Sequence, residues 1–514
     1  LHRVDRRQRQ MCIRDRTLEQ LIVIGAGVIW GLVGIIVQGR MLLLGLAGFV
    51  VLTVFGAVRV HGRSGPAWAW TVLRYLVRAA TGQTTYKQEL AAHEVILVDG
   101  EPTRPVQEDT TVAERDAKGK IKPGKPVRFN LPGMSNELLV YALPNGAGMA
   151  WEPRRREAVV CAKVMTTRGF DLESHDAKEE RSLSWGATLA AAATVGGVCR
   201  LQASDQTTLI SGADVRAFYQ GKQEQAGITG ADIDPFLDTA FRELMKEAQD
   251  MPVHEQWLTL VVSADQIGSQ LKQLGGGIPA MMEHVLKVMA TIEGLLPRSG
   301  TRVTAWHSPR SLAGLSRSAF DPDAAQMVTE TDSEGMAVGA SPAQAGPVAV
   351  EACPGHLFTD GYLHRTFKVA ELPQRLARLG FLDELVFAGD FRHTVSVYMA
   401  PRDRGAAMRD TKRRYSSWQT DTKMMDKWDR PPSPEHMQEL EDIEREQDEL
   451  MARHASLKVL VLVTVSGRTE SELASATSQM LTAAATAECQ LRTLWTEQDG
   501  AFIGAALPFG QVKM

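Results

Sequence analysis

The chain has 514 residues, of which 44% are hydrophobic and 23% charged, and its formal net charge is -4. This length allows two or three domains, and the nearly balanced charge argues against a protein that coats nucleic acid. The five cysteines form no CxxC pair, which excludes the usual zinc and thiol-redox motifs and is typical of small buried side chains in a reducing cytoplasm.

Residues 1–16 are interpreted as a sequencing or assembly artefact. The run from Arg6 to Arg16 (RRQRQMCIRDR) resembles translated adapter sequence. Segments of this kind are excluded from reasoning about the fold.

Residues 17–60 are predicted to form a transmembrane helix hairpin. The runs Leu21 to Val37 and Met41 to Val58 contain no ionisable residue, and only three residues separate them. At about 1.5 Å per residue, each run reaches most of the way across a hydrocarbon core of roughly 30 Å. Basic residues follow the second run and mark the cytoplasmic face, so both termini are expected in the cytoplasm of an inner-membrane protein. The alternatives are a signal peptide and a hairpin buried in a protein core.

Glycines in both runs favour close packing of the two helices. Small residues let helix backbones approach each other in lipid, and one GxxxG pair is present. The predicted packing residues are Gly27, Gly31, Gly45 and Gly48.

Residues 61–99 are predicted to be a juxtamembrane amphipathic segment. The stretch from Trp68 to Thr81 is aromatic and basic with helical spacing. Tryptophans favour the depth of the lipid headgroups, and arginines favour anionic lipid. The predicted membrane-surface residues are Arg59, Arg63, Trp68, Trp70, Arg74 and Arg78. An ordinary amphipathic core helix is the alternative.

Two α/β units are predicted after a linker and small β region at residues 100–157. Residues 158–346 alternate strand patterns, such as Trp257 to Val262, with helical patterns, such as Ile278 to Leu296. The polar stretch 321–346 is expected to be a mobile excursion. The whole chain is therefore predicted to be α+β, with a transmembrane hairpin followed by two cytosolic α/β sandwich units.

The second unit, residues 347–514, is predicted to be ferredoxin-like. Its strand candidates His364 to Ala370, Thr394 to Met399 and Leu457 to Val465 are separated by helical segments, and the helical Thr469 to Thr486 precedes a last strand. This order matches the ferredoxin-like arrangement of β-α-β-β-α-β.

Residues 402–453 are predicted to be a charged helical insertion in that unit. Arg402 to Arg430 holds nine basic residues against five acids, whereas Glu435 to Glu449 holds eight acids against one arginine, and prolines separate the halves. Two antiparallel helices with complementary faces explain this pattern. Docking of a partner protein is the alternative, with these candidate contacts: Arg409, Lys412, Arg413, Arg414, Glu441 and Glu444. Direct nucleic-acid binding is disfavoured, because acids interrupt the basic half and would repel phosphate.

No catalytic, cofactor or metal site is predicted. The segment Gly212 to Lys222 lacks the spacing of a phosphate-binding loop, and no HExxH pattern occurs. His175 with Asp171 and Asp176 is a candidate metal set, but a polar turn before a helix explains these residues more simply.

The C-terminal half resembles a known family of proteins. The run from Phe367 to Pro401, the strand Val459 to Val465, and the ending with Phe502 and Pro508 are similar to the N-terminal, non-motor portion of the assembly ATPases of conjugative type IV secretion systems. A closer resemblance is to an actinobacterial conjugation-associated integral membrane protein family, which couples two spans to this portion. The matching stretches are Arg63 to Arg78, the helix around Trp185, Glu255 to Ser263, and Ser308 to Pro322.

The resemblance implies a non-catalytic membrane-anchored subunit of a conjugative DNA-transfer or type IV-like secretion apparatus. Such a subunit would dock a separate ATPase at the cytoplasmic membrane. Its expected partners are membrane lipid, that ATPase, other transfer-channel subunits and further copies in a homo- or hetero-oligomer. A membrane subunit of a type VII secretion core and a membrane-bound enzyme with an unrecognised site are the alternatives.

Overall fold

The computed structural model describes most of the chain, and the structural statements below concern the described residues. These are residues 18–37, 40–60, 62–88, 96–98, 101–103, 111–117, 119–129, 131–134, 137–166, 174–194, 196–210, 219, 221, 223, 226–227, 234–247, 251–324, 339–340, 342–372, 380–402, 404–427, 431–451 and 457–512. Residues 1–16, interpreted above as an artefact, and most of the polar stretch 321–346 lie outside them.

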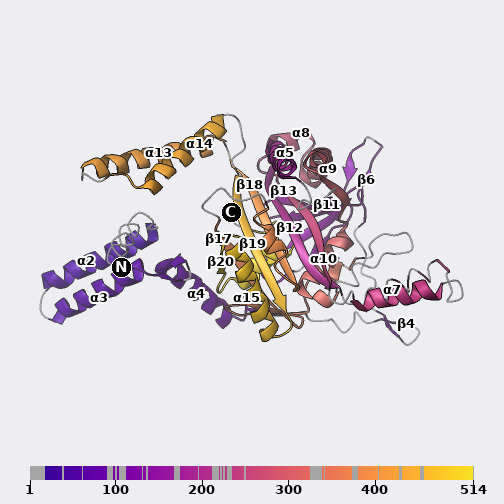
Figure 1. Cartoon of the computed structure of the whole chain (residues 1–514), viewed down its shortest axis with the longest axis horizontal. Coiled ribbons are helices and arrows are strands. Elements are labelled where there is room, and N and C mark those ends of the chain that lie inside the picture. Colours follow the sequence, from indigo (N-terminus) through magenta and orange to yellow (C-terminus); the bar gives the residue numbers. More distant parts are fainter. Residues whose placement is uncertain are drawn as a thin grey trace.

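The chain starts with a helix hairpin of α2 (Leu18–Val37) and α3 (Arg40–Ala57), which projects from the molecule (Figure 1). Among the described residues, no helix combines the length and the apolar character needed to cross a bilayer. The prediction of a transmembrane hairpin is therefore wrong. The polar residues Glu19 and Gln20 lie in the first turn of α2, and α3 has 18 residues starting at Arg40, so each apolar stretch is shorter than the roughly 20 residues of a typical span.

The hairpin is followed by short elements that lead into the main sheet. These are β1 (Arg59–Val60), β2 (Arg63–Ser64), α4 (Gly65–Ala80) and β3 (Thr85–Lys87). β1 pairs with β2, and β3 pairs with a strand more than 250 residues later in the chain. The juxtamembrane segment is therefore part of the folded body.

The body is built around one antiparallel sheet of 14 strands. The strands of its first half are β8 (Val127–Phe129), β9 (Leu138–Ala142), β10 (Gly148–Glu152), β11 (Glu157–Thr166), β12 (Val198–Ile210), β13 (Met251–Ser263) and β14 (Thr301–Trp306). Those of its second half are β3, β15 (Ala349–Ala352), β16 (Leu357–Thr359), β17 (Tyr362–Glu371), β18 (His393–Pro401), β19 (Leu457–Gly467) and β20 (Gln490–Thr493). Two small hairpins lie apart from it: β4 (Ile96–Val98) with β5 (Glu101–Thr103), and β6 (Glu114–Arg115) with β7 (Ile121–Lys122).

Helices cover the sheet or project from it. They are α5 (His175–Thr194), α7 (Pro235–Glu247), α8 (Gly268–Gln273), α9 (Gly277–Leu295), α10 (Pro309–Phe320), α12 (Asp383–Val386), α13 (Arg404–Lys427), α14 (Pro434–Met451), α15 (Glu470–Thr486) and α16 (Gln498–Ala506). Local sequence explains several helix starts. For example, the Ser308 side chain accepts a hydrogen bond from the backbone of Ser311, and Pro309 stands at the first helical position of α10.

The two halves of the sheet have the same topology. The first half runs β11-α5-β12-β13-α9-β14 and orders its strands β14-β11-β13-β12. The second half runs β17-α12-β18-β19-α15-β20 and orders its strands β20-β17-β19-β18. Both orders are ferredoxin-like, so the fold contains an internal repeat.

The repeats join edge to edge through β12 and β18. These strands pair antiparallel from Leu201 opposite Met399 to Thr207 opposite His393. Because the equivalent strand of each repeat makes the contact, the repeats are related by an approximate two-fold axis. The prediction of two α/β sandwich units is therefore corrected to one continuous α+β sheet, since pairing satisfies the backbone groups of both edge strands.

Both faces of the sheet are buried in the first half. Along β11, Ala158 and Val160 pack into the cluster that contains α9, whereas Val159 and Cys161 pack into the cluster that contains α10 and α16. Successive strand residues point to opposite faces, which explains why this strand is hydrophobic at nearly every position.

Each repeat carries an insertion at the same place. α7 lies in the connection between β12 and β13, and the pair α13 and α14 lies in the connection between β18 and β19. Because β12 and β18 run antiparallel, the two insertions leave the body at opposite ends (Figure 1).

Candidate membrane-attachment and docking surfaces

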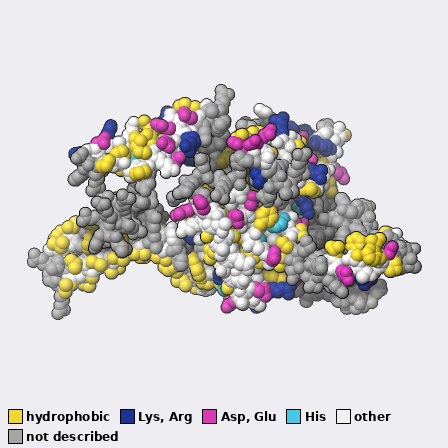
Figure 2. All heavy atoms as spheres, in the orientation of Figure 1, with side chains coloured by type: hydrophobic (Ala, Val, Ile, Leu, Met, Phe, Trp, Pro, Cys, Tyr) yellow, Lys and Arg dark blue, Asp and Glu magenta, His cyan; other side chains and the backbone are white. Residues whose placement is uncertain are grey.

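The α2–α3 hairpin exposes a large apolar surface. Consecutive side chains of α2 are exposed: Ile29 at 64% with Trp30 at 56%, and Ile35 at 56% with Ile36 at 77%. Leu43 of α3 is exposed at 74%. A helix turns about 100° per residue, so consecutive exposed residues point in different directions around its axis. Figure 2 shows this surface as a nearly continuous hydrophobic area.

The four predicted packing glycines lie where the two helices meet. A Cβ added at Gly45 would come within 2.5 Å of the Gly34 Cα, and one at Gly48 would come within 2.4 Å of the Trp30 ring. Added Cβ atoms at Gly27 and Gly31 would meet Leu52 at 3.0 Å and Phe49 at 3.2 Å. The close approach of the helices therefore depends on residues without side chains.

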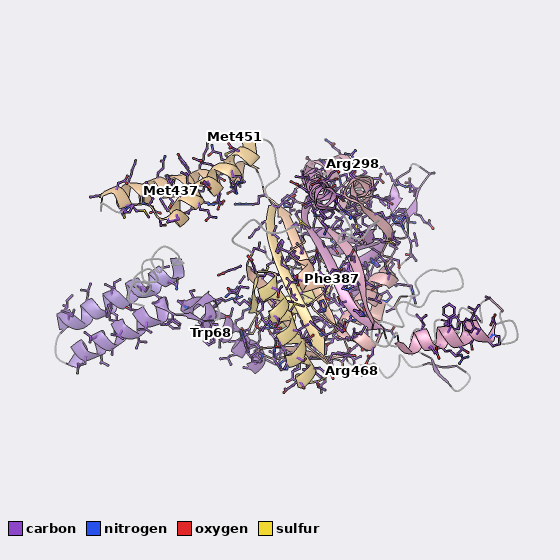
Figure 3. All side chains as sticks on the ribbon, in the orientation of Figure 1. Trp68, Arg298, Phe387, Met437, Met451 and Arg468 are labelled. Atoms are coloured by element: carbon purple, nitrogen blue, oxygen red, sulfur yellow. The ribbon has the colours of Figure 1, made fainter. Side chains whose placement is uncertain are left out.

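Helix α4 is amphipathic and continues the exposed apolar surface. Its exposed apolar side chains follow helical spacing: Trp70 at 67%, Leu73 at 52%, Leu76 at 56% and Val77 at 55%. Arg74 is exposed beside them, whereas Trp68 is partly buried. Figure 3 labels Trp68 near the junction of the hairpin and the body.

Helix α4 and the strand β2 that precedes it are attached to the body by three long-range contacts. Arg63 pairs with Glu497 at 2.5 Å, and Arg78 pairs with Asp499. The Tyr75 hydroxyl donates a hydrogen bond to the Ala352 carbonyl at 3.1 Å.

Two of the arginines predicted to face lipid therefore form ion pairs within the chain instead. Arg63 and Arg78 bind carboxylates next to α16 and in its first turn, while Arg74 remains exposed. The side chain of Arg59 lies outside the described residues.

The charged insertion forms an arm of two antiparallel helices, α13 and α14. Arg414 pairs with Glu446 at 2.5 Å across the helices, and the Trp418 indole donates to the His436 carbonyl at 2.8 Å. The Trp418 and His436 rings stack with centroids 4.9 Å apart. The remaining predicted docking residues are exposed: Arg409, Lys412 and Arg413 on α13, and Glu441 and Glu444 on α14. Arg414 thus stabilises the arm, and the other five side chains are accessible.

A polar cluster lies at the junction of the two repeats. The His254 ring nitrogen Nδ1 is 2.9 Å from Asp205 and 3.1 Å from the Thr207 hydroxyl, and Gln256 donates to Asp205 at 2.7 Å. A catalytic triad requires the carboxylate and the hydroxyl at different nitrogens of the histidine. Here both lie at the same nitrogen, so Asp205, His254 and Thr207 do not have the geometry of a triad. The Thr207 hydroxyl also lies 3.2 Å from His393 Nε2, and each nitrogen of that ring faces a backbone carbonyl.

A second polar group at this junction holds the C-terminal segment against the sheet. The Gln202 amide donates to the Leu507 carbonyl at 3.0 Å, and its oxygen accepts from the Gly510 backbone at 3.0 Å. Ser396 donates to the Ala505 carbonyl at 2.6 Å. The sequence pattern does not reveal this group, because alternating polar residues on a strand predict a solvent-facing side, whereas Gln202 is fully buried.

Replacing Gln202 by Leu is expected to lower the free energy of unfolding by about 3 kcal/mol. The substitution leaves the Leu507 carbonyl and the Gly510 N–H buried without partners, at roughly 1–3 kcal/mol each. Gln206→Leu on the same strand is the matched control, because its amide has one contact of 3.5 Å to Thr394. Urea unfolding measures the loss, and faster amide exchange across residues 504–511 localises it. Equal effects of the two substitutions would contradict this account.

The described residues contain no group of three or more His, Cys, Asp or Glu arranged to hold a metal ion. His175 begins α5, while Asp171 lies outside the described residues. Neither protein-family models nor curated proteins match the chain. The exposed surfaces of the α2–α3 hairpin, of α4 and of the α13–α14 arm are the features on which a function can be proposed.

Proposed function

We propose that this protein is a non-catalytic, membrane-attached subunit that docks a separate ATPase at the cytoplasmic membrane. The observation that carries the proposal is the apolar surface of the α2–α3 hairpin. Exposed apolar helices of this kind bury their side chains at the boundary between lipid headgroups and acyl chains, where a helix lies on the membrane without crossing it.

Helix α4 supports the same attachment. Its exposed stripe of Trp70, Leu73 and Val77 follows the hairpin directly, and the exposed Arg74 suits anionic headgroups. The ion pairs from Arg63 and Arg78 to the region of α16 keep the body close to this surface.

The α13–α14 arm is the surface proposed for the partner protein. Its exposed basic residues are Arg409, Lys412 and Arg413, and they lie on a helix that projects into solvent (Figure 1). Holding a partner near the membrane replaces a bimolecular encounter with a high local concentration. The resemblance to conjugation-associated membrane proteins supports a place in a DNA-transfer or type IV-like secretion apparatus.

The test is co-purification of a nucleotide-hydrolysing partner with the full chain. Replacing Arg409, Lys412 and Arg413 by Glu is expected to lower the recovered ATPase activity about tenfold, because each interfacial charge contributes up to about 1 kcal/mol. The control replaces three exposed lysines elsewhere: Lys87, Lys120 and Lys122. Equal recovery with both variants would place the docking surface elsewhere, and nucleotide turnover by the purified chain alone would contradict a non-catalytic subunit.

A further inference from the structure

Helix α7 carries an apolar stripe that the membrane-attachment proposal does not use. Four large side chains on this one helix are exposed: Phe236 at 78%, Leu237 at 53%, Phe241 at 49% and Leu244 at 66%. Leu237, Phe241 and Leu244 follow the i, i+4, i+7 spacing of one helix face, which is the spacing of helical anchors in protein recognition. Figure 2 shows this stripe as an isolated hydrophobic patch at one end of the molecule.

The charge around the α7 stripe distinguishes it from the lipid-facing stripe of α4. Asp234 and Glu243 are exposed, and Arg242 is neutralised by Asp238 at 2.7 Å. Helices that lie on membranes are typically basic. Helix α4 has two arginines and no acidic residue, whereas α7 has three acids beside Arg242 and Lys246. The α7 arm also leaves the body at the end opposite to the α2–α3 hairpin (Figure 1). A protein surface with apolar and basic character is therefore the complement that α7 requires.

The tip of the α13–α14 arm has this character. Met424 and Met437 are exposed at 57% and 46%. Lys423, Lys427 and Asp426 are exposed around Met424, so basic residues outnumber acids there by one. Methionine side chains adapt to irregular partners and make favourable contacts with aromatic rings. Figure 3 labels Met437 on the projecting arm.

We propose that the α7 stripe of one copy of this chain docks on the Met424–Met437 tip of a second copy. Phenylalanine and leucine side chains of α7 contact the methionines, and Glu243 faces the lysines of the tip. The two surfaces are different and leave opposite ends of the body, so the contact is head-to-tail. Each copy keeps one free donor surface and one free acceptor surface, and such an interface propagates into a ring or a filament.

The test mixes two variants of the full chain, solubilised in detergent. The first, Phe241→Ser with Leu244→Ser, loses the α7 stripe, and the second, Met424→Ser with Met437→Ser, loses the tip. The wild type is expected to form higher oligomers, and each variant alone is expected to be monomeric. An equimolar mixture is expected to stop at dimers, because only one complementary pair of surfaces remains. Sedimentation velocity measures the masses.

Several outcomes would overturn the proposal. Oligomers of both single variants that match the wild type would place self-association elsewhere, including the hairpin, which both variants retain. A mixture that stays monomeric would exclude contact between the two surfaces. A wild type that remains monomeric up to about 0.1 mM would exclude an association of useful strength.

A charge exchange supplies an independent control that leaves the apolar residues in place. Glu243→Lys and Lys423→Glu are each expected to weaken the association up to about fivefold, as for an exposed ion pair. Combining both substitutions in one chain is expected to restore it, because the pair is reversed. Failure of the double variant to recover would contradict the assigned orientation. Neither readout depends on lipid or on an ATPase, so this proposal and the proposed function can fail separately.

Discussion

Replacing exposed residues of the hairpin is expected to reduce binding to lipid vesicles by at least about 100-fold. The variant changes Ile29, Ile36 and Leu43, which are exposed at 64%, 77% and 74%, to Ser. Burial of each such side chain in an apolar phase contributes roughly 1.5–3 kcal/mol, and about 2.7 kcal/mol corresponds to a factor of 100. Flotation with vesicles of phosphatidylglycerol and phosphatidylethanolamine measures the change.

The matched control removes three apolar side chains from α7. Phe236, Leu237 and Leu244 are similarly exposed, so the variant that changes them to Ser loses a comparable apolar area. Its vesicle binding, measured at a protein concentration at which the wild type is monomeric, is expected to equal that of the wild type, because α7 lies at the other end of the molecule. Equal losses in both variants would indicate a general hydrophobic effect and would contradict attachment through the hairpin.

Acidification is expected to destabilise the folded body well above the pH at which most carboxylates titrate. Burial, together with the charge of Arg392, lowers the pKa of His364 from 6.5 to about 3, and burial lowers the pKa of His307 to about 4. Both histidines therefore stay neutral in the folded state when the unfolded chain takes up protons below pH 6.5. As the pH falls below 6.5, the free energy of unfolding decreases by about 1.4 kcal/mol per pH unit for each histidine. Between pH 6.5 and 5 this loss is about 2 kcal/mol for each histidine.

Urea unfolding at several pH values measures this slope. His364 lies between hydrogen-bonding hydroxyl groups of Thr359 at 2.7 Å and Ser466 at 2.8 Å, so His364→Gln retains polar contacts. This variant and His307→Gln are each expected to reduce the slope between pH 6.5 and 5 by about 1.4 kcal/mol per pH unit. Burial also lowers the pKa of His393, which accounts for a residual slope in the double variant. A wild-type slope that persists in the double variant would show that other groups cause the acid sensitivity.

The predicted membrane span shows how a strong local pattern can be misinterpreted. The apolar runs of α2 and α3 were recognised as helices, and the hairpin with its glycine contacts follows from residue size at Gly45 and Gly48. The extent of each helix was not determined by the pattern. Polar residues enter both first turns, and no described helix has the length and apolar character of a span.

The arginines near helix α4 show that a local sequence pattern does not identify the partner of a charged side chain. The position of Arg63 and Arg78 after two apolar runs predicts that they face lipid. In the folded chain, Arg63 of β2 and Arg78 of α4 bind Glu497 and Asp499, more than 400 residues away. The acids lie next to α16 and in its first turn, and only the tertiary fold brings them to α4.

The sequence by itself determined the local elements of this protein. Periodicity predicted the strand around Trp257 to Val262, the helix Thr469 to Thr486, and the charged pair of helices, because backbone conformation responds to neighbouring residues and to the alternation of apolar side chains. Tertiary structure decided how these elements combine. The pairing of β12 with β18, the burial of Gln202 beneath the C-terminal segment, and the opposite exits of the two arms depend on hydrogen bonds between residues far apart in the chain. Those contacts carry no local signal, because each strand edge or amide can be satisfied by any complementary partner that folding brings within reach.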